Sequence, residues 1–424
     1  MNQRFLWGAA TSSHQVEGNN QANDWWTWEM QGKVKDRSAR ACDHYHRFHE
    51  DFQIASDAGH TAHRFSLEWS RLEPSPGVWN KEAVDHYKAV FEALKSRGME
   101  PVVTLHHFTN PQWFSDRGGW THPESAAYFS AYVQRVIETF GRDIRYWITI
   151  NEPLIYVYFS FLEGSWPPGQ KSFRSACRAM RNLLAAHIDA YQCIHRHYER
   201  LQWGPVWVSI AKHVTYFEPC RKNSWADKAA VWLRNWFFNH LFIQAAQTGF
   251  LFFPGIFCES FPATQTLDFI GLNYYSRSFI RFKGIREQDF MGEMCSWDHH
   301  PDRGTEKNDL DWDIYPQGLS FVLKDFKRYR LPVMICENGI CTGDDEQRSR
   351  YILGHLNQAR RAMREGVDLR GYFYWSLLDN FEWAHGFAPR FGIVEVNYEN
   401  FSRKIRKSSQ VLSDLCRIIQ SERG

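Results

Sequence analysis

A chain of 424 residues is longer than most single domains, so its length allows either two domains or one large fold of the barrel type. Its 50 Lys and Arg residues nearly balance 48 Asp and Glu residues. A net charge of +2 is too small to produce an electrostatic field that would attract nucleic acid. The 19 Trp, 18 Tyr and 32 Phe residues suit a well-packed core, and they also suit a site that binds flat apolar faces.

The nine cysteines are scattered along the chain and include no C-x-x-C pair. An odd number cannot be fully paired within one chain, so a disulfide framework is not expected. This pattern is typical of a reducing compartment, and no charged leader with an apolar stretch and a cleavage site precedes Phe5. We therefore expect a cytoplasmic protein.

The most apolar stretch is Leu241–Phe257, which is interrupted by Gln244, Gln247 and Pro254. It falls short of a membrane-spanning segment and is interpreted as a buried helix followed by a loop. The sequence thus predicts binding to neither a membrane nor a nucleic acid.

No tandem repeat, low-complexity run or Pro/Ser-rich linker divides the chain, so residues 1–424 are expected to form a single domain. Short runs of β-branched and aromatic residues, typical of strands, recur along it. These eight runs are Phe5–Ser12, Ala62–Glu68, Pro101–His106, Ile144–Asn151, Val206–Val214, Leu267–Tyr274, Pro332–Glu337 and Leu369–Ser376.

Amphipathic stretches lie between these runs. Within residues 81–97, Val84, Tyr87 and Phe91 fall on one helical face, and Gly98 ends the helix. Further helices are expected at Glu124–Phe140, Trp225–Thr248 and Glu346–Glu365. Such alternation predicts parallel strands joined by helical crossovers, and eight units close into an α/β fold, a single (β/α)8 TIM barrel. The structural alternative is a doubly wound open sheet.

Functional sites on such a barrel are built at the C-terminal ends of its strands. Polar and aromatic residues follow seven of the eight predicted strands, whereas the strand that ends near His213 offers little. They are His14, Gln15, Glu68, Trp69, His106, His107, Asn151, Glu152, Asn273, Tyr274, Tyr275, Glu337, Asn338, Trp375, Glu382 and Trp383.

Glu152 and Glu337 stand at the ends of the fourth and seventh predicted strands, so a barrel would place them across from one another. Either residue alone would fit a structural ion pair. Together they could lie on either side of a glycosidic bond, and the polar and aromatic groups around them fit a sugar.

The sequences around both glutamates resemble motifs of glycoside hydrolase family 1. Residues 149–153 (Thr-Ile-Asn-Glu-Pro) resemble its T-x-N-E-P acid/base motif. Residues 335–339 (Ile-Cys-Glu-Asn-Gly) resemble its I-T-E-N-G nucleophile motif, with Cys336 in place of Thr. The resemblance extends from residues 5–11 to residues 390–394.

This resemblance implies a β-glucosidase-type enzyme that works by double displacement, without a cofactor and without a metal. Glu337 would attack the anomeric carbon while Glu152 protonates the leaving oxygen and later deprotonates water, so the configuration is retained. The mechanism requires the two carboxyl groups to lie about 5–5.5 Å apart.

The same matching implies roles for the surrounding residues. Arg64 would lie beside the nucleophile, Tyr275 would donate to it, and Asn273 would support the site. The sugar would be bound by Gln15, His107, Asn151 and Glu382, with Trp375 beneath its ring, Trp383 at its polar edge, Phe391 at its 6-hydroxyl and Trp312 on the leaving-group side.

The implied substrates are β-glycosides or short β-linked oligosaccharides with terminal non-reducing β-D-glucosyl, β-D-galactosyl or β-D-fucosyl residues. A member that prefers galactose or fucose and a non-catalytic sugar-binding barrel remain as alternatives. Glu382 disfavours 6-phosphorylated sugars, because a carboxylate repels phosphate. Phe108 and Leu154 replace residues that are usually Trp in the family, so the preference for a leaving group stays open. The sequence also leaves open homo-oligomer formation and thermal stability.

Three other groups could be mistaken for catalytic or metal-binding residues. We interpret Glu68 and Glu163 as structural acids. His44, His46 and His49 are close in sequence, and the proposed chemistry needs no metal, so we do not assign them a metal site.

Overall fold

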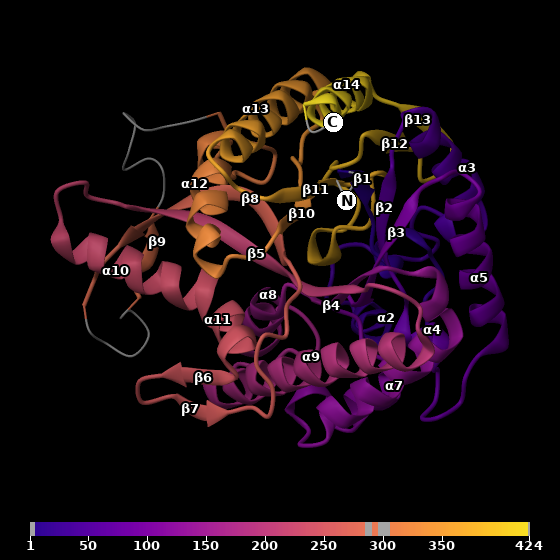
Figure 1. Ribbon diagram of the computed structural model, residues 1–424, viewed down its shortest axis with the longest axis horizontal. Coiled ribbons are helices and arrows are strands. Elements are labelled where there is room, and N and C mark those ends of the chain that lie inside the picture. Colours follow the sequence, from indigo (N-terminus) through magenta and orange to yellow (C-terminus); the bar gives the residue numbers. More distant parts are fainter. Residues whose placement is uncertain (1–4, 285–290, 296–305, 423–424) are drawn as a thin grey trace.

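The structure, a computed structural model, describes residues 5–284, 291–295 and 306–422. At its centre a sheet of parallel strands closes on itself, with helices around the outside (Figure 1). In pairing order the strands are β10 (Val333–Asn338), β11 (Leu369–Trp375), β1 (Leu6–Ala10), β2 (Ala62–Ser66), β3 (Glu100–His106), β4 (Tyr146–Asn151), β5 (Trp207–Pro219) and β8 (Ile270–Arg281). Strand β8 pairs back with β10 and closes the barrel.

These eight strands coincide with the eight predicted segments, which confirms the (β/α)8 TIM barrel and makes the open-sheet alternative wrong. Two strands exceed their predicted ends. Strands β5 and β8 remain paired as far as Pro219 and Ile280, and β9 (Glu293–Cys295) joins β8 antiparallel. The extension was missed because Glu218 in β5 and Arg277 in β8 interrupt the apolar pattern that marks a buried parallel strand.

Helices in the crossovers cover the outer face of the barrel. They are α3 (His44–Asp57), α5 (Lys81–Lys95), α7 (Ser125–Phe140), α9 (Phe173–Leu201), α10 (Trp225–Asn235), α11 (Leu241–Thr248), α12 (Pro316–Phe326), α13 (Asp345–Arg364) and α14 (Lys407–Ser421). In α5 the side chain of Asn80 accepts from the first-turn amides, and the predicted face with Val84, Tyr87 and Phe91 is buried.

The segment predicted as one helix, residues 225–248, is divided. Helices α10 and α11 are separated by a π-helical turn, Trp236–His240. After α11 the chain forms a hairpin of β6 (Phe250–Phe253) and β7 (Phe257–Ser260) where a loop was expected. Shorter elements are α1 (Ser13–Val16), α2 (Asp24–Met30), α4 (Trp69–Leu72), α6 (Gln112–Asp116), α8 (Pro153–Val157), and a ribbon of β12 (Val394–Val396) and β13 (Arg403–Ile405).

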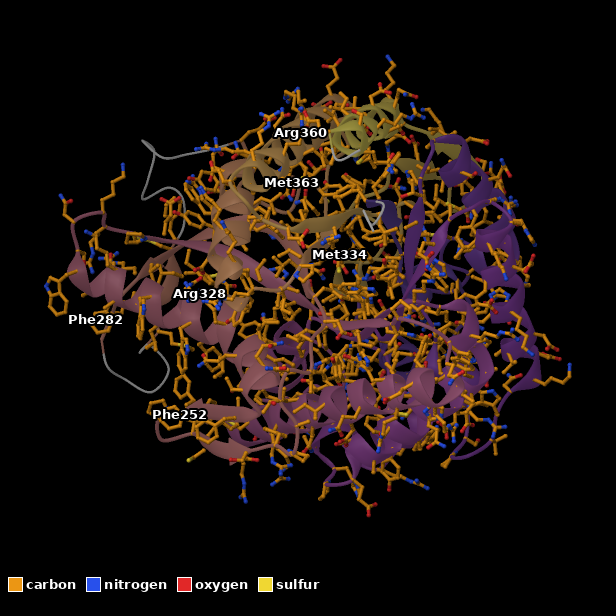
Figure 2. The ribbon with its side chains drawn as sticks, viewed as in Figure 1. Phe252, Phe282, Arg328, Met334, Arg360 and Met363 are labelled. Atoms are coloured by element: carbon orange, nitrogen blue, oxygen red, sulfur yellow. A yellow bond between two sulfur atoms is a disulfide. The ribbon has the colours of Figure 1, made fainter. Side chains whose placement is uncertain are left out.

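Apolar side chains fill two layers, one inside the barrel and one between the strands and the helices. The inner cluster includes Leu6, Val102, Ile148, Met334 and Phe373. Figure 2 shows Met334 in the middle of the molecule, whereas Phe252 lies outside on the β6–β7 hairpin. Because packed side chains fill the inside of such a barrel, a binding site belongs at one end of it.

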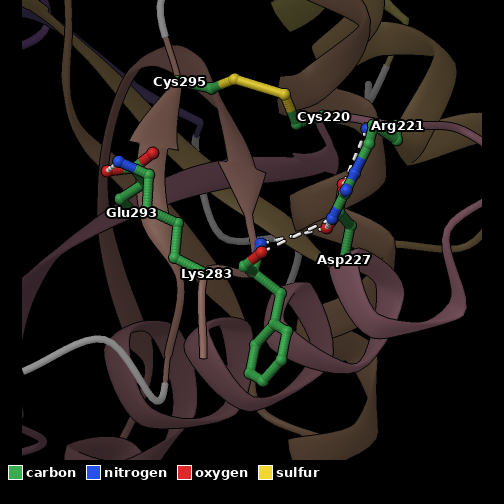
Figure 3. The surroundings of a disulfide bond; sticks show 7 residues. Cys220, Arg221, Asp227, Lys283, Glu293 and Cys295 are labelled. Atoms are coloured by element: carbon green, nitrogen blue, oxygen red, sulfur yellow. Dashed lines mark hydrogen bonds and ion pairs between the residues drawn. A yellow bond between two sulfur atoms is a disulfide. The ribbon is translucent and has the colours of Figure 1, made fainter. Parts of the chain in front are cut away.

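One disulfide bond joins Cys220, just after β5, to Cys295 in β9, with their Cα atoms 6.6 Å apart (Figure 3). The other seven cysteines are free, so the bond is a single link that the cysteine count did not anticipate. Beside it an ion pair joins Lys283 to Glu293 at 2.5 Å. Together with the sheet pairing, these links hold β9 against the extended ends of β5 and β8.

Among the helices that the structure describes, none is both long and apolar enough to cross a membrane.

Candidate active site

Both sequence-predicted glutamates lie where the strand pairing is irregular. The register between β4 and β5 shifts between Ile148 and Asn151, just before Glu152, and the register between β10 and β8 shifts at Glu337. Such irregularities re-aim side chains at barrel rims. Glu152 also has a left-handed φ of 44°, which is uncommon for a residue other than glycine and is often found at functional sites.

The carboxylate of Glu337 accepts hydrogen bonds at both of its oxygens. Arg64 donates from Nη1 to Oε1 at 2.5 Å, and the Tyr275 hydroxyl donates to Oε2 at 2.6 Å. All three side chains are buried, and Arg64 also donates to the Cys336 carbonyl at 3.1 Å. A charge-assisted bond from a buried guanidinium favours the ionised form of Glu337.

Among the residues that the structure describes, two form hydrogen-bond contacts with the carboxyl group of Glu152, and both contacts are at Oε1. Asn273 donates from Nδ2 at 2.8 Å, and Nδ1 of His213 lies 3.1 Å away. The carboxyl is buried and accepts no hydrogen bond from an arginine in the described part of the chain, so its surroundings differ from those of Glu337.

Hydrogen bonds through Asn151 connect the two glutamates. Its Oδ1 accepts from Arg64 Nη2 at 2.6 Å and from Asn273 Nδ2 at 3.2 Å. Its Nδ2 lies 3.3 Å from Nε2 of His107. A continuous path therefore runs from the guanidinium beside Glu337 to the amide beside Glu152.

Burial and mutual repulsion favour the protonated form of one of these two carboxyls. Burial raises the pKa of Glu337 to about 7; Arg64 opposes this rise, and the charge of Glu152 adds to it. Two carboxyls that interact so strongly release their protons as a pair, so the pair retains one proton below about pH 7.

A third buried carboxyl, Glu382, lies close by. Gln15 Nε2 donates to its Oε2 at 3.2 Å and to Asn380 Oδ1 at 3.1 Å. Burial, and then the charges of Glu337 and Glu152, raises the pKa of Glu382 to about 8. A carboxyl in this state can accept or donate hydrogen bonds to a polyhydroxyl ligand.

Aromatic rings form the walls around these polar groups. The ring of His107 stacks with Trp375 at 5.8 Å and with Trp383 at 6.3 Å between ring centroids. Phe108 packs against Trp383 at 5.3 Å and is buried, and Leu154 is buried as well. Phe108 therefore lies in the aromatic wall, and neither departure from the family pattern falls on the carboxyl pair.

On another side of the site, Phe391 lies between Tyr275 at 6.3 Å and Trp312 at 6.2 Å. Trp312 is 37% exposed, whereas Phe391 and Trp375 are buried. The site thus has a buried polar end and an aromatic rim that faces solvent, as a ligand of two joined units would require.

The structure brings together every residue that the sequence assigned to the site, and Gln15 and Glu382, which contact each other, lie close enough to the glutamate pair to interact with its charge. Glu68 does not belong to this group, because Ser13, Ser70 and Thr109 donate to its two oxygens. The sequence interpretation missed His213, which follows directly on Lys212 in β5. Its position near the end of a barrel strand was the one available signal.

No group of three or more potential metal ligands is found in the described part of the chain. In the histidine cluster, Nδ1 of His44 lies 2.7 Å from Asp51 and Nδ1 of His46 lies 2.8 Å from Asp43.

Fold and site together define a barrel protein with paired buried glutamates at the ends of β4 and β10 and polar and aromatic side chains around them. The sequence model of glycosyl hydrolase family 1 matches residues 1–420. The chain belongs to this family.

Individual relatives agree with this assignment. Beta-glucosidase A of Thermotoga maritima is 34% identical over 97% of this chain and 96% of its own length. A beta-galactosidase of Pyrococcus woesei is 29% identical over 96% of this chain and 95% of its own length. The solved structure of a beta-glycosidase from Pyrococcus horikoshii, 39% identical, superposes with a TM-score of 0.90 over 97% of this chain and 94% of that one.

Proposed function

We propose that this protein is a retaining β-glycosidase that hydrolyses terminal non-reducing β-D-glucosyl residues, with Glu337 as nucleophile and Glu152 as acid/base. The observation that carries the proposal is the unequal environment of the two glutamates. Glu337 contacts a fixed positive charge at 2.5 Å, whereas Glu152 is held by an amide and an imidazole. Two carboxyls with different roles need such a difference.

In the first step Glu337 attacks the anomeric carbon, and the bond from that carbon to the leaving oxygen breaks as Glu152 gives this oxygen its proton. The product is a glycosyl ester on Glu337. In the second step Glu152 removes a proton from water, the water oxygen bonds to the anomeric carbon, and Glu337 leaves as a carboxylate. Two inversions at one carbon retain the configuration.

The single proton of the carboxyl pair belongs on Glu152 when substrate is bound. Arg64 and Tyr275 donate directly to Glu337 and favour its ionised form. Its negative charge then holds the proton on Glu152 until the glycosyl ester removes that charge. Glu152 can next act as a base.

The polar and aromatic side chains of the site suit a sugar ring. Glu382, Gln15 and His107 offer hydrogen-bonding groups to adjacent hydroxyls, and Asn151 offers its amide to the 2-hydroxyl. The flat ring of Trp375 suits the apolar face of a sugar. Trp312 at the rim suits the leaving group.

A β-glucosidase and a β-galactosidase among the relatives support a preference for glucosides with activity on galactosides and fucosides. Glu382 would accept hydrogen bonds from a C4 hydroxyl of either configuration, and loss of the 6-hydroxyl removes only a contact near Phe391. The alternative is an enzyme that prefers galactosides or fucosides. Ratios of kcat/KM for the aryl β-glucoside, β-galactoside and β-fucoside distinguish these two preferences.

A Glu337→Gly variant tests the proposal. It should lose turnover of an aryl β-glucoside, and added azide should restore part of the activity and give the α-glucosyl azide, because azide attacks from the vacated face. A matched Glu152→Ala variant should instead give the β-azide from the glycosyl-enzyme. Full activity of Glu337→Gly without azide would overturn the assignment.

A cytoplasmic location remains a proposal from the cysteine pattern. Seven of the nine cysteines are free, which is typical of a reducing compartment. The Cys220–Cys295 bond is evidence against it, and alkylation of thiols in freshly lysed cells would show whether this bond exists there. Mass measurement in solution would decide between a monomer and a homo-oligomer.

A further inference from the structure

His213 contacts the proposed acid/base directly, and the proposed mechanism gives it no role. Its Nδ1 lies 3.1 Å from Oε1 of Glu152. Its ring is stacked with Tyr275 at 6.0 Å and meets Phe238 edge-on at 5.8 Å. The imidazole is therefore held between two aromatic rings with one nitrogen directed at the carboxyl group.

A second contact orients the imidazole. The Thr215 hydroxyl lies 3.4 Å from Nε2 of His213. When this hydroxyl donates to Nε2, the hydrogen of a neutral imidazole is on Nδ1, and Nδ1 donates to Glu152. This arrangement favours the tautomer that donates a hydrogen bond from Nδ1 to the carboxylate of Glu152.

Both donors act on one oxygen of Glu152. Asn273 Nδ2 and His213 Nδ1 meet at Oε1, and in the part of the chain that the structure describes no donor contacts Oε2. A proton on this carboxyl group therefore goes to Oε2, the oxygen left for the leaving group of a substrate.

Lys212 places a buried amine beside this histidine. The side chain is fully buried, donates from Nζ to the His213 carbonyl at 2.6 Å and lies 4.4 Å from the centre of the Phe238 ring. Burial lowers the pKa of Lys212 to about 7, and the charge of Glu152 opposes this. The two residues thus form a donor and a titratable cation on the same side of Glu152.

We propose that His213 is a positioning residue for the acid/base: it holds Oε1 of Glu152 so that Oε2 carries the proton to the leaving oxygen, and together with Lys212 it sets the alkaline limit of activity. This inference rests on the proposed role of Glu152. It adds a residue outside the matched motifs to the residues that govern the proton.

Other charged or titratable groups also face this carboxyl. From the strands packed around it they are Arg64 on β2, His107 after β3, Lys212 and His213 on β5, Tyr275 on β8, Glu337 on β10 and Glu382 after β11. Glu337 and Glu382 favour the protonated form of Glu152, whereas Lys212 and His213 favour its ionised form.

The sign of the effect follows from these contacts. Burial raises the pKa of Glu152, whereas the hydrogen bonds from His213 and Asn273 and the charge of Lys212 lower it. Formation of the glycosyl-enzyme requires protonated Glu152, so activity falls as pH rises through its pKa. Loss of His213 or of the Lys212 charge raises that pKa and moves the alkaline limb of kcat/KM to higher pH.

The test uses the pH dependence of kcat/KM for 4-nitrophenyl β-glucoside. His213→Phe keeps a flat ring between Tyr275 and Phe238 and removes the donor, and its alkaline limb should move up by about one pH unit. His213→Gln keeps a donor and should recover at least half of the shift. Lys212→Met removes the charge together with the hydrogen bond to the His213 carbonyl, and should move the limb in the same direction.

A structural role alone would lower activity without moving the limb, so an unchanged limb in soluble, folded His213→Phe overturns the inference. A downward shift does so as well. If His213→Phe does not fold, His213→Gln and Lys212→Met decide the question through the same limb.

Failure of the proposed function is recognised separately with Glu152→Ala. An acid/base variant keeps most of its glycosylation rate on 2,4-dinitrophenyl β-glucoside, a leaving group that needs no proton, and forms β-glucosyl azide. If Glu152→Ala shows both properties and the alkaline limb of His213→Phe stays at the parental pH, only the role given to His213 is wrong. If Glu152→Ala shows neither property, the assignment of Glu152 is wrong.

Discussion

The guanidinium of Arg64 donates to the carboxylate of Glu337 at 2.5 Å from a side chain that is 1% exposed. The same group donates from Nη2 to Asn151, so one buried cation serves residues from β4 and β10. A buried ion pair of this kind needs both partners, because either one alone would be an uncompensated charge in a dry site.

We therefore expect Arg64→Met to lower kcat/KM by about 100-fold or more, equivalent to about 2.7 kcal/mol. Arg64 lowers the pKa of Glu337, so its loss raises that pKa. The nucleophile must be ionised, and the acidic limb of the kcat/KM profile should move to higher pH. Arg64→Lys is the matched control, because it keeps the charge and should shift the limb less. An acidic limb that stays in place in Arg64→Met would contradict the role given to this arginine.

Tyr275→Phe removes the hydroxyl that donates to Glu337 Oε2 at 2.6 Å and leaves the ring. A hydrogen bond to a charged group contributes about 1.5–3 kcal/mol, so kcat/KM should fall at least about tenfold, and the acidic limb should again move to higher pH. Steady-state kinetics across pH measures both effects.

Tyr274→Phe provides the control for this substitution. Its hydroxyl donates to the Tyr315 carbonyl at 2.8 Å, away from the carboxyl pair. It should lower Tm and leave the pH profile in place. Equal pH shifts in both tyrosine variants would mean that the Tyr275 hydroxyl has no specific effect on Glu337.

Glu382→Gln should change the pH dependence of stability. Burial raises the pKa of Glu382 to about 8, so the folded state binds this proton more tightly than the unfolded state, whose pKa is about 4.3. The stabilisation is fully present below the unfolded pKa and is lost as pH rises through about 8. A glutamine cannot ionise, so the Tm of Glu382→Gln relative to the parent should increase between about pH 5 and pH 8.

Thermal unfolding of the parent, Glu382→Gln and Glu382→Asp at several pH values measures this dependence. Glu382→Asp retains a titratable carboxyl and should keep the parental slope. Parallel curves for the parent and Glu382→Gln would show that Glu382 is not held in a protonated form by the fold.

Removal of the disulfide should lower stability and preserve chemistry. The bond closes a loop of 75 residues, and loops of that length correspond to about 4 kcal/mol of unfolding free energy in the chain-entropy account. A double Cys220→Ser/Cys295→Ser variant should have a lower Tm, with kcat/KM for aryl glucosides within about twofold of the parent. Cys258→Ser, at an exposed free thiol, is the control and should change neither. An unchanged Tm in the double variant would show that the bond does not stabilise the fold.

Most of the barrel could be predicted from local sequence patterns, because parallel strands covered on both sides are near-continuous apolar runs. The same reason explains the misses. The ends of β5 and β8 alternate with polar residues and acquire their pairing from one another. The β6–β7 hairpin was interpreted as a loop although Pro254 and Gly255 between its strands are a turn signal, because its two strands are only four residues long. The Cys220–Cys295 link depends on residues 75 positions apart, so no local pattern marks it.

Sequence by itself determined the eight strands, the family, and the placement of Glu152 and Glu337 at the ends of two of them. Only the tertiary structure decided which donor atoms form hydrogen bonds with each carboxyl group. Arg64 is 273 positions from Glu337, and His213 is 61 positions from Glu152. Contacts across such separations depend on how the barrel closes and on the register shifts beside both glutamates, and neither can be read from local propensity.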